Sequence, residues 1–267
     1  MRYFRPGLLV FVFLLVSAFL SAQQSTTAPP PILQQALAAL TGGSPVTDVT
    51  MTGTITVTNA SGTQSGTITM VATASGQSQV VLDLPAGRNT DIRNYSANPR
   101  TGSWTGPDGT SHAYAATELM GPSPAWFYPA FIVSSAVSPN CAASYVGQEI
   151  RQGATVQHVS ITPNPAVFTP LPVIASLRSL PPHFVLGQND LYLDPSSLLP
   201  TALVRLISSR GPVWRRRYAP EEIRFSDYRT VEGRPAAFHI QAYLGSVLMD
   251  TQLSSISFNT GAVIAAN

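Results

Sequence analysis

Apolar and polar residues alternate from residue 49 to residue 58, where a threonine stands at every second position. Successive side chains of a strand point to opposite faces, so this pattern predicts a strand with one buried face and one solvent-facing face. Residues 66–74, with Ile68 and Met70 on the apolar side, and residues 79–84 predict two more strands. Turns that contain glycine separate the three segments, which is typical of an antiparallel meander.

Two segments predict helices. In residues 32–40 the apolar side chains recur every three or four positions, with Pro31 before them and a pair of glycines after them. This helix is so short that it must pack on the sheet to be stable. The aromatic-rich residues 124–137 predict a second helical segment, interrupted at Pro129, with its apolar side on the sheet.

The rest of the chain predicts further strands and their connections. Residues 85–111 are rich in glycine and proline, so we expect a loop region there, with one short strand around residues 103–105. The proline-rich residues 162–189 predict another connection, with a short helix at residues 173–180. The remaining strands are predicted at residues 144–152, 155–161, 190–193, 202–208, 222–231, 237–244 and 247–258.

These elements predict one α+β domain without internal repeats, built as a long antiparallel sheet with helices covering one face. The alternation within two of its strands also predicts which side chains are buried. Four side chains are expected in the core: Ile223, Phe225, Phe238 and Ile240. Three of their neighbours are expected to be clearly more exposed: Arg224, His239 and Gln241.

The N-terminus has the features of a secretory signal. Two arginines precede an apolar stretch over residues 8–20, which is short for a membrane helix of about 20 apolar residues, and small residues follow it. We predict a cleaved signal peptide at residues 1–22, a disordered leader at residues 23–31 and one domain over residues 32–267, with Gln23 as the mature N-terminus. The protein is then periplasmic or secreted, without a transmembrane span after cleavage but compatible with peripheral membrane contact. An uncleaved N-terminal anchor is the alternative.

Charge and cysteine content exclude several classes of protein. Charged residues make up 10% of the chain, against about 25% in an average soluble domain. The formal net charge is +2, and the two arginines of the signal account for this excess. A nucleic-acid-binding protein would carry a clear basic surplus, so no nucleic-acid partner is expected. Cys141 has no second cysteine to pair with, which favours a small apolar filler over a reactive thiol.

No catalytic, metal-binding or cofactor motif stands out. The sequence around Ser123 lacks the second glycine of a nucleophile elbow and has a proline on each side. The four histidines, at positions 112, 158, 183 and 239, do not show the spacing of zinc ligands. Five acids are interpreted as ordinary surface and turn positions: Asp190, Asp194, Glu221, Glu222 and Asp227. We therefore expect no enzyme, no metal and no cofactor, although an active site assembled from distant residues stays open.

Two clusters of side chains each allow two interpretations. Arg215, Arg216 and Arg217 could bind acidic lipid headgroups or phosphate, or they could be solvated or paired with acids at the rim of a hairpin. No wider basic surface accompanies them, which favours the second interpretation. One group of aromatic side chains is either the lining of an apolar cavity or simple core: Trp104, Trp126, Phe127, Tyr128 and Phe131.

Four segments of the C-terminal third carry a resemblance to a known family: residues 190–200, 222–233, 238–244 and 254–261. Together they resemble exported bacterial proteins similar to the outer-membrane lipoprotein-sorting (LolA-like) carriers. The order of a signal peptide, a short helix, threonine-alternating strands and the sequence WTGPDG at residues 104–109 fits as well. The similarity covers most of the mature chain, and its motifs are structural and turn-like.

The resemblance implies an incompletely closed antiparallel β-barrel, with helices over the open side and an apolar cavity that holds acyl chains without a cofactor. The chain departs from the family in one respect. These carriers commonly have an arginine on an early strand that latches the helical lid, whereas residues 49–58, 66–74 and 79–84 contain no arginine. We therefore assign no latch residue from the resemblance.

The leading hypothesis is a periplasmic binding or carrier protein for a lipid, an acyl chain or a lipoprotein. The alternative is a non-catalytic envelope scaffold or interaction domain with a filled core. Under the carrier hypothesis, an acyl chain is desolvated against a small set of apolar side chains. This predicted cavity lining consists of Ile55, Val57, Ile68, Met70, Trp126 and Phe131. The identity of the ligand and the oligomeric state stay open.

Overall fold

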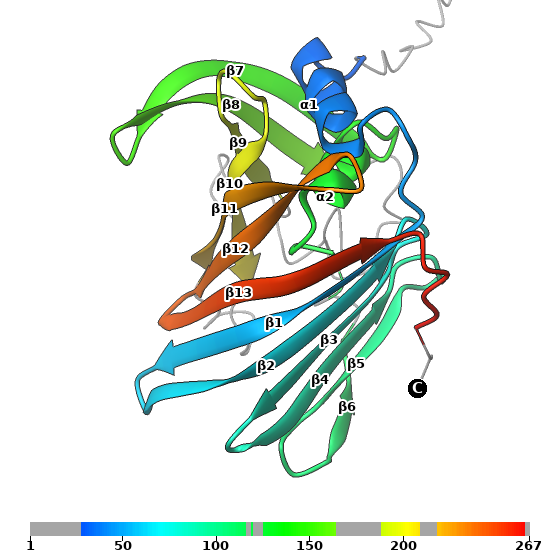
Figure 1. Cartoon of the computed structure of the whole chain (residues 1–267), viewed down its shortest axis with the longest axis vertical. Coiled ribbons are helices and arrows are strands. Elements are labelled where there is room, and N and C mark those ends of the chain that lie inside the picture. Colours follow the sequence, from blue (N-terminus) through cyan, green and yellow to red (C-terminus); the bar gives the residue numbers. More distant parts are fainter. Residues whose placement is uncertain (1–27, 116–118, 120–124, 164–187, 209–217, 265–267) are drawn as a thin grey trace, which may run out of the picture.

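The computed structural model describes residues 28–115, 119, 125–163, 188–208 and 218–264. They form a 13-stranded antiparallel sheet in the order β6-β5-β4-β3-β2-β1-β13-β12-β11-β10-β9-β8-β7. Figure 1 shows this sheet curving around two short helices, and it does not close because β6 and β7 remain as its two edges. The predicted long antiparallel sheet is confirmed. The molecule is mostly β, however, so the structure supports the predicted α+β class and the predicted helices over one face only roughly.

The strands have the following bounds. The first six are β1 (Asp48–Asn59), β2 (Gly62–Thr73), β3 (Gln77–Leu84), β4 (Gly87–Asn94), β5 (Thr101–Thr105) and β6 (Ser111–Ala113). The other seven are β7 (Cys141–Arg151), β8 (Ala154–Pro163), β9 (Asn189–Leu193), β10 (Pro200–Ser208), β11 (Tyr218–Val231), β12 (Arg234–Leu244) and β13 (Val247–Phe258).

The first six strands form a meander in which each strand pairs with the next. The alternating threonines lie on the outer face, as expected. The prediction of a loop region at residues 85–111 was wrong for about half of it, because β4 and β5 lie there and only the strand near residues 103–105 had been expected. Ile92 is the one apolar side chain of β4, so this strand lacks the alternation of apolar and polar residues that identifies a strand in a sequence.

The last seven strands form a second meander, whose predicted segments are confirmed to within a few residues. The two halves join where β1 pairs with β13, with Val49 opposite Phe258 at one end of the ladder. The pairing of β1 with β13 shifts its register between Thr52 and Gly53. Glycine is needed at this point because a Cβ on Gly53 would lie 2.3 Å from the carbonyl oxygen of Gln252. The predicted helix at residues 173–180 lies outside the described residues.

Two helices pack inside the curve of the sheet. Helix α1 (Pro31–Thr41) begins at a proline and ends at Gly42, which has a φ of 60°, and it buries Leu33, Ala36 and Leu40. Helix α2 (Pro129–Ala136) also begins at a proline, so Pro129 starts the helix and does not interrupt it as predicted. In the described part of the chain, no helix is long and apolar enough to cross a membrane.

The predicted facing of the late strands is confirmed. The four side chains expected in the core are buried, with exposed fractions of 0–6%: Ile223, Phe225, Phe238 and Ile240. Their three polar neighbours are each partly exposed: Arg224, His239 and Gln241. The buried side of these strands is the side on which α1 and α2 pack, so it defines the inner face of the sheet.

Candidate functional site: the inner face of the curved sheet

Along the inner face, apolar side chains on the central strands give way to polar side chains near the edge strand β6. A single row of directly paired residues crosses β13, β1, β2 and β3 through Ile256, Met51, Met70 and Val80, all of which are buried. The same row continues onto the next strands with Asp91, Trp104 and His112. Paired residues of neighbouring strands point to the same side. An apolar wall and a polar border therefore adjoin on one continuous surface.

The six residues predicted to line a cavity do come together. Ile55, Ile68, Met70 and Phe131 belong to one buried apolar cluster, and Val57 and Trp126 pack against it while remaining partly exposed. Ile55, Ile68 and Met70 are at most 1% exposed, so protein atoms cover them in this structure. The sequence pattern thus identified residues of the interior, and contact with a ligand remains a proposal.

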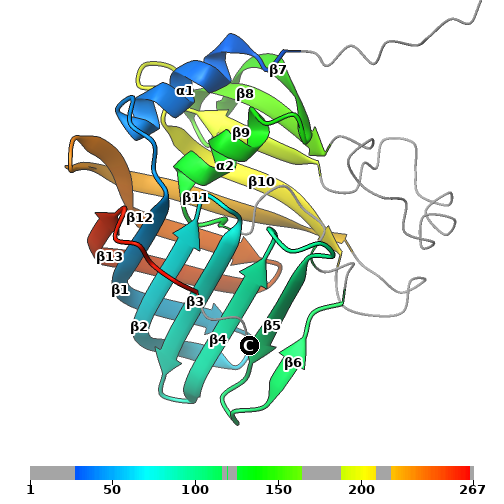
Figure 2. The same ribbon diagram turned by 90° about the vertical axis from the view of Figure 1, so that its right-hand side faces the viewer.

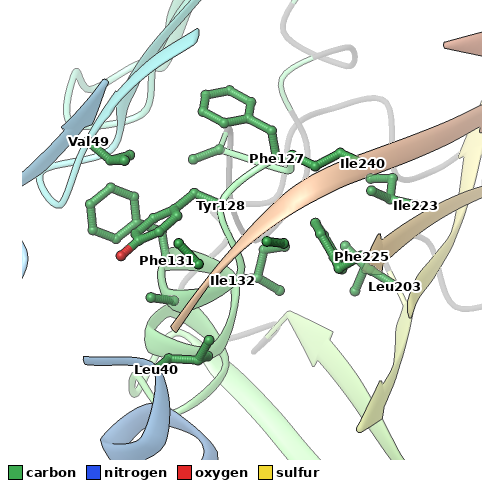
Figure 3. Close-up of a cluster of buried hydrophobic side chains, with 14 of the residues drawn as sticks. Leu40, Val49, Phe127, Tyr128, Phe131, Ile132, Leu203, Ile223, Phe225 and Ile240 are labelled. Carbon is green, nitrogen blue, oxygen red and sulfur yellow. The ribbon is translucent and has the colours of Figure 1, made fainter. Parts of the chain in front are cut away.

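Helix α2 and the residues before it fill the part of the interior that faces β10–β12. In Figure 3, Ile132 lies on the side of Phe225 and Leu203, whereas Tyr128 and Phe131 lie on the side of Val49, and all of them belong to one core cluster. Phe127 and Val133 are completely buried, and Tyr128 is 2% exposed. The Tyr128 hydroxyl has no hydrogen-bond partner in the described part of the chain, and burial raises its pKa well above the ordinary value. At this end of the molecule the aromatic cluster is core.

A charged cluster stands where the apolar wall ends. The guanidinium of Arg93 donates to both carboxylate oxygens of Asp91, from Nε at 3.0 Å and from Nη2 at 3.2 Å. The Tyr114 hydroxyl donates to the same carboxylate, and the Arg93 guanidinium lies 5.0 Å from the centre of the Tyr114 ring. Burial and the Asp91 charge raise the pKa of Tyr114 to about 12, so this hydroxyl stays protonated at neutral pH. Burial alone would lower the pKa of Arg93, but the Asp91 carboxylate outweighs this and raises it, so the guanidinium stays charged.

The packing of Tyr114 depends on Gly102, which pairs with Arg93 across β4 and β5. A Cβ on Gly102 would lie 2.6 Å from the carbonyl oxygen of Ile92 and 3.1 Å from the Tyr114 ring. The backbone N–H of Tyr114 also donates to the Gly102 carbonyl. A side chain at this position would therefore push Tyr114 away from the cluster.

An aromatic pair completes this border. Trp104 and His112 stack with ring centres 4.3 Å apart and 22° between their planes. We call the whole group the polar rim, and it consists of Asn89, Asp91, Arg93, Trp104, His112 and Tyr114. The sequence reasoning missed it because residues 85–111 were interpreted as a loop. The sequence offered no alternation of apolar and polar residues that would have revealed this strand, because β4 has polar residues on both faces.

A second ion pair lies on the inner face at β10 and β11. Arg205 and Glu221 are directly paired across these strands, and Arg205 Nη2 donates to Glu221 Oε1 at 2.6 Å. Glu221 is 4% exposed, so its assignment to the surface was wrong. Its neighbour Glu222 alternates to the outer face, where it pairs with Arg151 at 3.0 Å and with Arg224 at 2.7 Å. Two adjacent acids of one strand therefore lie in opposite environments.

Helix α1 is tied to the sheet by an arginine that the sequence reasoning did not assign. Arg234, the first residue of β12, donates from Nε to the Thr41 carbonyl at the C-terminal end of α1, at 3.0 Å. A guanidinium at this end of a helix also complements the helix dipole. The early segments at residues 49–58, 66–74 and 79–84 contain no arginine, and the late strand β12 supplies this contact to α1. No local pattern marks Arg234, because its distance from Thr41 along the chain is 193 residues.

The outer face carries an open groove and a polar relay. The groove, of about 350 Å³, is lined by Gln79, Arg88, Thr90, Ile92, Thr105, Gly106, Pro107 and Gly109.

In the relay, Ser226 Oγ lies 3.1 Å from one ring nitrogen of His239, and the other ring nitrogen lies 2.8 Å from the Asp250 carboxylate. Ser226, His239 and Asp250 thus have the order of a serine–histidine–acid relay, assembled from three neighbouring strands.

The other sequence candidates have limited roles here. Ser123, His183 and the arginine run at residues 215–217 lie outside the described residues. Cys141 is half-buried against the core cluster, and burial raises the pKa of its thiol, as suits an apolar filler.

Comparison with known proteins supports the fold. No protein-family model and no curated protein sequence matches this chain. The structure is similar to an outer membrane lipoprotein-sorting protein domain from Vibrio parahaemolyticus, with 11% identity, a TM-score of 0.53 and coverage of 89% of this chain and 95% of that one. It is also similar to a DUF1329 family protein from Desulfovibrio piger, with 10% identity, a TM-score of 0.52 and coverage of 88% and 95%. A LolA superfamily protein from Nitrosomonas europaea matches with 10% identity, a TM-score of 0.49 and coverage of 86% and 92%.

Proposed function

We propose that this protein, which shares the fold of lipoprotein-sorting domains, is an exported binding or carrier protein for a lipid, an acyl chain or the acyl part of a lipoprotein. One observation carries the proposal: the sheet is curved and open, and its inner face carries an apolar wall over β13 and β1–β3, with two short helices packed inside the curve. Such a wall offers an acyl chain many apolar contacts at once. The similarity to the Vibrio parahaemolyticus domain supports a ligand of this kind.

Burial of the acyl chain provides the driving force. Each buried methylene contributes about 0.8 kcal/mol, so a twelve-carbon chain gains about 9 kcal/mol before the cost of association, which is about 4–15 kcal/mol. Because Ile55, Ile68 and Met70 are covered in this structure, a chain that reaches them displaces the side chains above them. Binding is then coupled to an outward shift of the helices α1 and α2.

The proposal includes the organisation of the chain. Residues 1–22 direct export as a cleaved signal, residues 23–31 form a leader, and residues 32–267 form the binding domain in the periplasm or outside the cell. Binding of this kind makes and breaks no covalent bond, so the protein works as a carrier and not as an enzyme. It needs no cofactor.

An envelope scaffold with a filled core is the second candidate, and the close packing around α2 favours it. Phe127 and Val133 leave no exposed surface, so the space between α2 and β10–β12 has little room for a ligand. The two candidates differ in what happens over β1–β3, where the carrier binds an acyl chain and the scaffold keeps its own side chains.

Native mass spectrometry and uptake of a fluorescent fatty acid distinguish the two. We expect the purified wild type to carry lipid or to take up the probe, and Met70→Glu to abolish both because it places a charge in the apolar wall. Thr69→Glu is the matched control, since Thr69 is exposed on the opposite face of the same strand. Phe131→Ala, which only removes apolar volume, should change the preferred chain length. A wild type that neither carries lipid nor takes up the probe would leave the scaffold as the better explanation.

A further inference from the structure

The polar rim is placed where the head of a chain-like ligand would lie. Met70 and Val80 of the apolar wall are followed in the same row by Asp91 and Trp104. In Figure 2 the two helices lie near β7–β9, whereas β4–β6 extend away from them. An acyl chain lying along the row against the wall would therefore bring its polar end onto the rim. This inference rests on the proposed carrier function.

Hydrogen-bonding capacity remains in the cluster after its internal contacts are counted. A guanidinium has five N–H donors, and Arg93 uses its Nε and one Nη2 donor on Asp91. Of its remaining N–H donors, one lies close to the Tyr114 hydroxyl, and the others have no partner among the described residues. The Tyr114 hydroxyl donates its proton to Asp91 and lies next to Arg93, and the Asp91 carboxylate has room for one more donor. The side chains of Asp91 and Arg93 are 32% and 23% exposed, so a ligand can reach them.

The charges of the rim disfavour a charged head group. A carboxylate or phosphate that approaches Arg93 also approaches Asp91, which repels it, and a cation that approaches Asp91 meets Arg93 in the same way. A hydroxyl group both donates and accepts, so it can use the free Arg93 donors together with the remaining acceptor capacity of Asp91. Several hydroxyls on one head group would use several of these positions at once.

The aromatic pair adds a flat apolar surface beside these hydrogen-bonding groups. Trp104 is the direct cross-strand neighbour of Asp91, and His112 stacks on it. A sugar or similar polyol presents hydroxyls at its edge and C–H groups on its faces. It can therefore hydrogen-bond to the charged pair while a face packs on an aromatic ring.

We propose that the polar rim is a head-group site for an uncharged, polyhydroxylated head, such as that of a sugar-bearing lipid, whose acyl chain lies on the adjoining apolar wall. In this site Arg93 donates to the head group and Asp91 holds the guanidinium in place. Tyr114 orients Asp91, and Trp104 supplies the packing surface.

Three amphiphiles that share a twelve-carbon chain test the proposal: dodecyl maltoside, dodecanoic acid and dodecyltrimethylammonium. Each is titrated below its micelle concentration against the mature protein, with displacement of a bound fluorescent fatty acid as the readout. We expect dodecyl maltoside to bind at least tenfold more tightly than either charged amphiphile. Arg93→Gln and Tyr114→Phe should each weaken the binding of dodecyl maltoside about five- to tenfold, as expected for the loss of one hydrogen bond. The affinity for dodecanoic acid should not change.

Arg88→Gln is the matched control, because Arg88 lies on the same strand but faces outward and pairs with Asp83 at 2.8 Å. Tyr114→Phe removes only a hydroxyl and keeps the packing of the ring, so the variant is expected to fold. A melting curve checks that each variant is folded. Equal binding of all three amphiphiles, or tighter binding of the anionic one, would overturn the head-group site and leave the carrier function intact. Failure of every amphiphile and of the fluorescent fatty acid to bind would overturn both.

Discussion

At the turn between β9 and β10, the Asp194 carboxylate accepts hydrogen bonds from the backbone and hydroxyl groups of two serines. Ser196 donates at 3.0 Å and 2.6 Å, and Ser197 donates at 2.8 Å and 2.9 Å. These bonds, led by the Ser196 hydroxyl, lower the pKa of Asp194 to about 2 from its ordinary value of 3.8. A carboxylate with such a pattern is typical of a turn, and the sequence assignment of Asp194 to a turn was right.

The shifted pKa predicts a specific loss of stability in acid. Because the pKa is lower in the folded state, the contribution of Asp194 is fully present above about pH 4 and is lost as the pH falls toward 2. Asp194→Asn should therefore be less stable than the wild type at pH 7, with a difference that shrinks between pH 4 and pH 2. Urea unfolding at a series of pH values measures it, and a constant difference across this range would contradict the assignment.

Arg234 gives a second prediction for a single residue. Arg234→Ala removes the hydrogen bond to the Thr41 carbonyl and a contact of the guanidinium with the Phe258 ring, whose centre is 5.4 Å away. We expect a loss of about 1–3 kcal/mol in the free energy of unfolding, and faster amide exchange in α1 than elsewhere.

Arg229→Ala is the control for this variant, because Arg229 lies near the same turn in an exposed ion pair with Asp227. Exposed pairs of this kind contribute little to the free energy of unfolding, because water screens the two charges. If α1 exchanged no faster in Arg234→Ala than in Arg229→Ala, Arg234 would not anchor the helix.

Among the elements, strands β11, β12 and β13 place Ser226, His239 and Asp250 in a relay that the sequence did not reveal. Ser226 and His239 are direct cross-strand neighbours, and Asp250 reaches His239 from the next strand. A hydrolase also needs N–H donors for the oxyanion. Around His239, strand β12 is paired with β11 on one side and with β13 on the other, so its backbone N–H groups bond to these neighbouring strands.

The relay is therefore expected to be a surface hydrogen-bond network. A fluorophosphonate probe, which labels activated serines, should leave Ser226 unmodified in peptide mass spectrometry. Ser226→Ala should change stability by no more than about 0.5 kcal/mol, since its hydroxyl is exposed. Labelling of Ser226 that is lost in His239→Asn would show a nucleophile and contradict a purely binding function.

At the scale of the whole molecule, the open sheet leaves two edges with different properties. The edge strand β6 has only three residues, which limits pairing with another chain. The other edge, β7, has 11 residues and carries three exposed apolar side chains: Tyr145 (48%), Val146 (58%) and Ile150 (71%). A register shift between Tyr145 and Gly147 interrupts its regularity. Long apolar edges promote association between chains.

This edge predicts concentration-dependent self-association of the mature protein. Ile150→Lys adds a charge to an exposed position of β7, so it should reduce association and leave the unfolding free energy within about 0.5 kcal/mol. Light scattering over a range of protein concentrations measures the effect. Val263→Lys, at an exposed position outside the sheet, is the control and should not change association. Equal association of wild type and Ile150→Lys would exclude β7 as the contact.

Local periodicity was enough to predict most of the elements. The alternation at residues 49–58 and the helical spacing at residues 32–40 each lie within one element, so neighbouring residues report them directly. The same holds for Ile223 and Phe225, whose burial follows from alternation along one strand. The sequence by itself thus determined a long antiparallel sheet with one apolar face, and many of the apolar residues on that face.

Only the tertiary structure decided how the two halves meet and where the polar groups lie. The pairing of β1 with β13, the anchoring of α1 by Arg234 and the relay at His239 all join residues that are distant along the chain or belong to different strands. The polar rim was hidden for another reason: β4 has polar residues on both faces, so its Asp91 and Arg93 become an inner-face cluster only through the register with Val80 and Ser78. Hydrophobic patterning records which residues avoid water, whereas register between strands decides which polar side chains share a face.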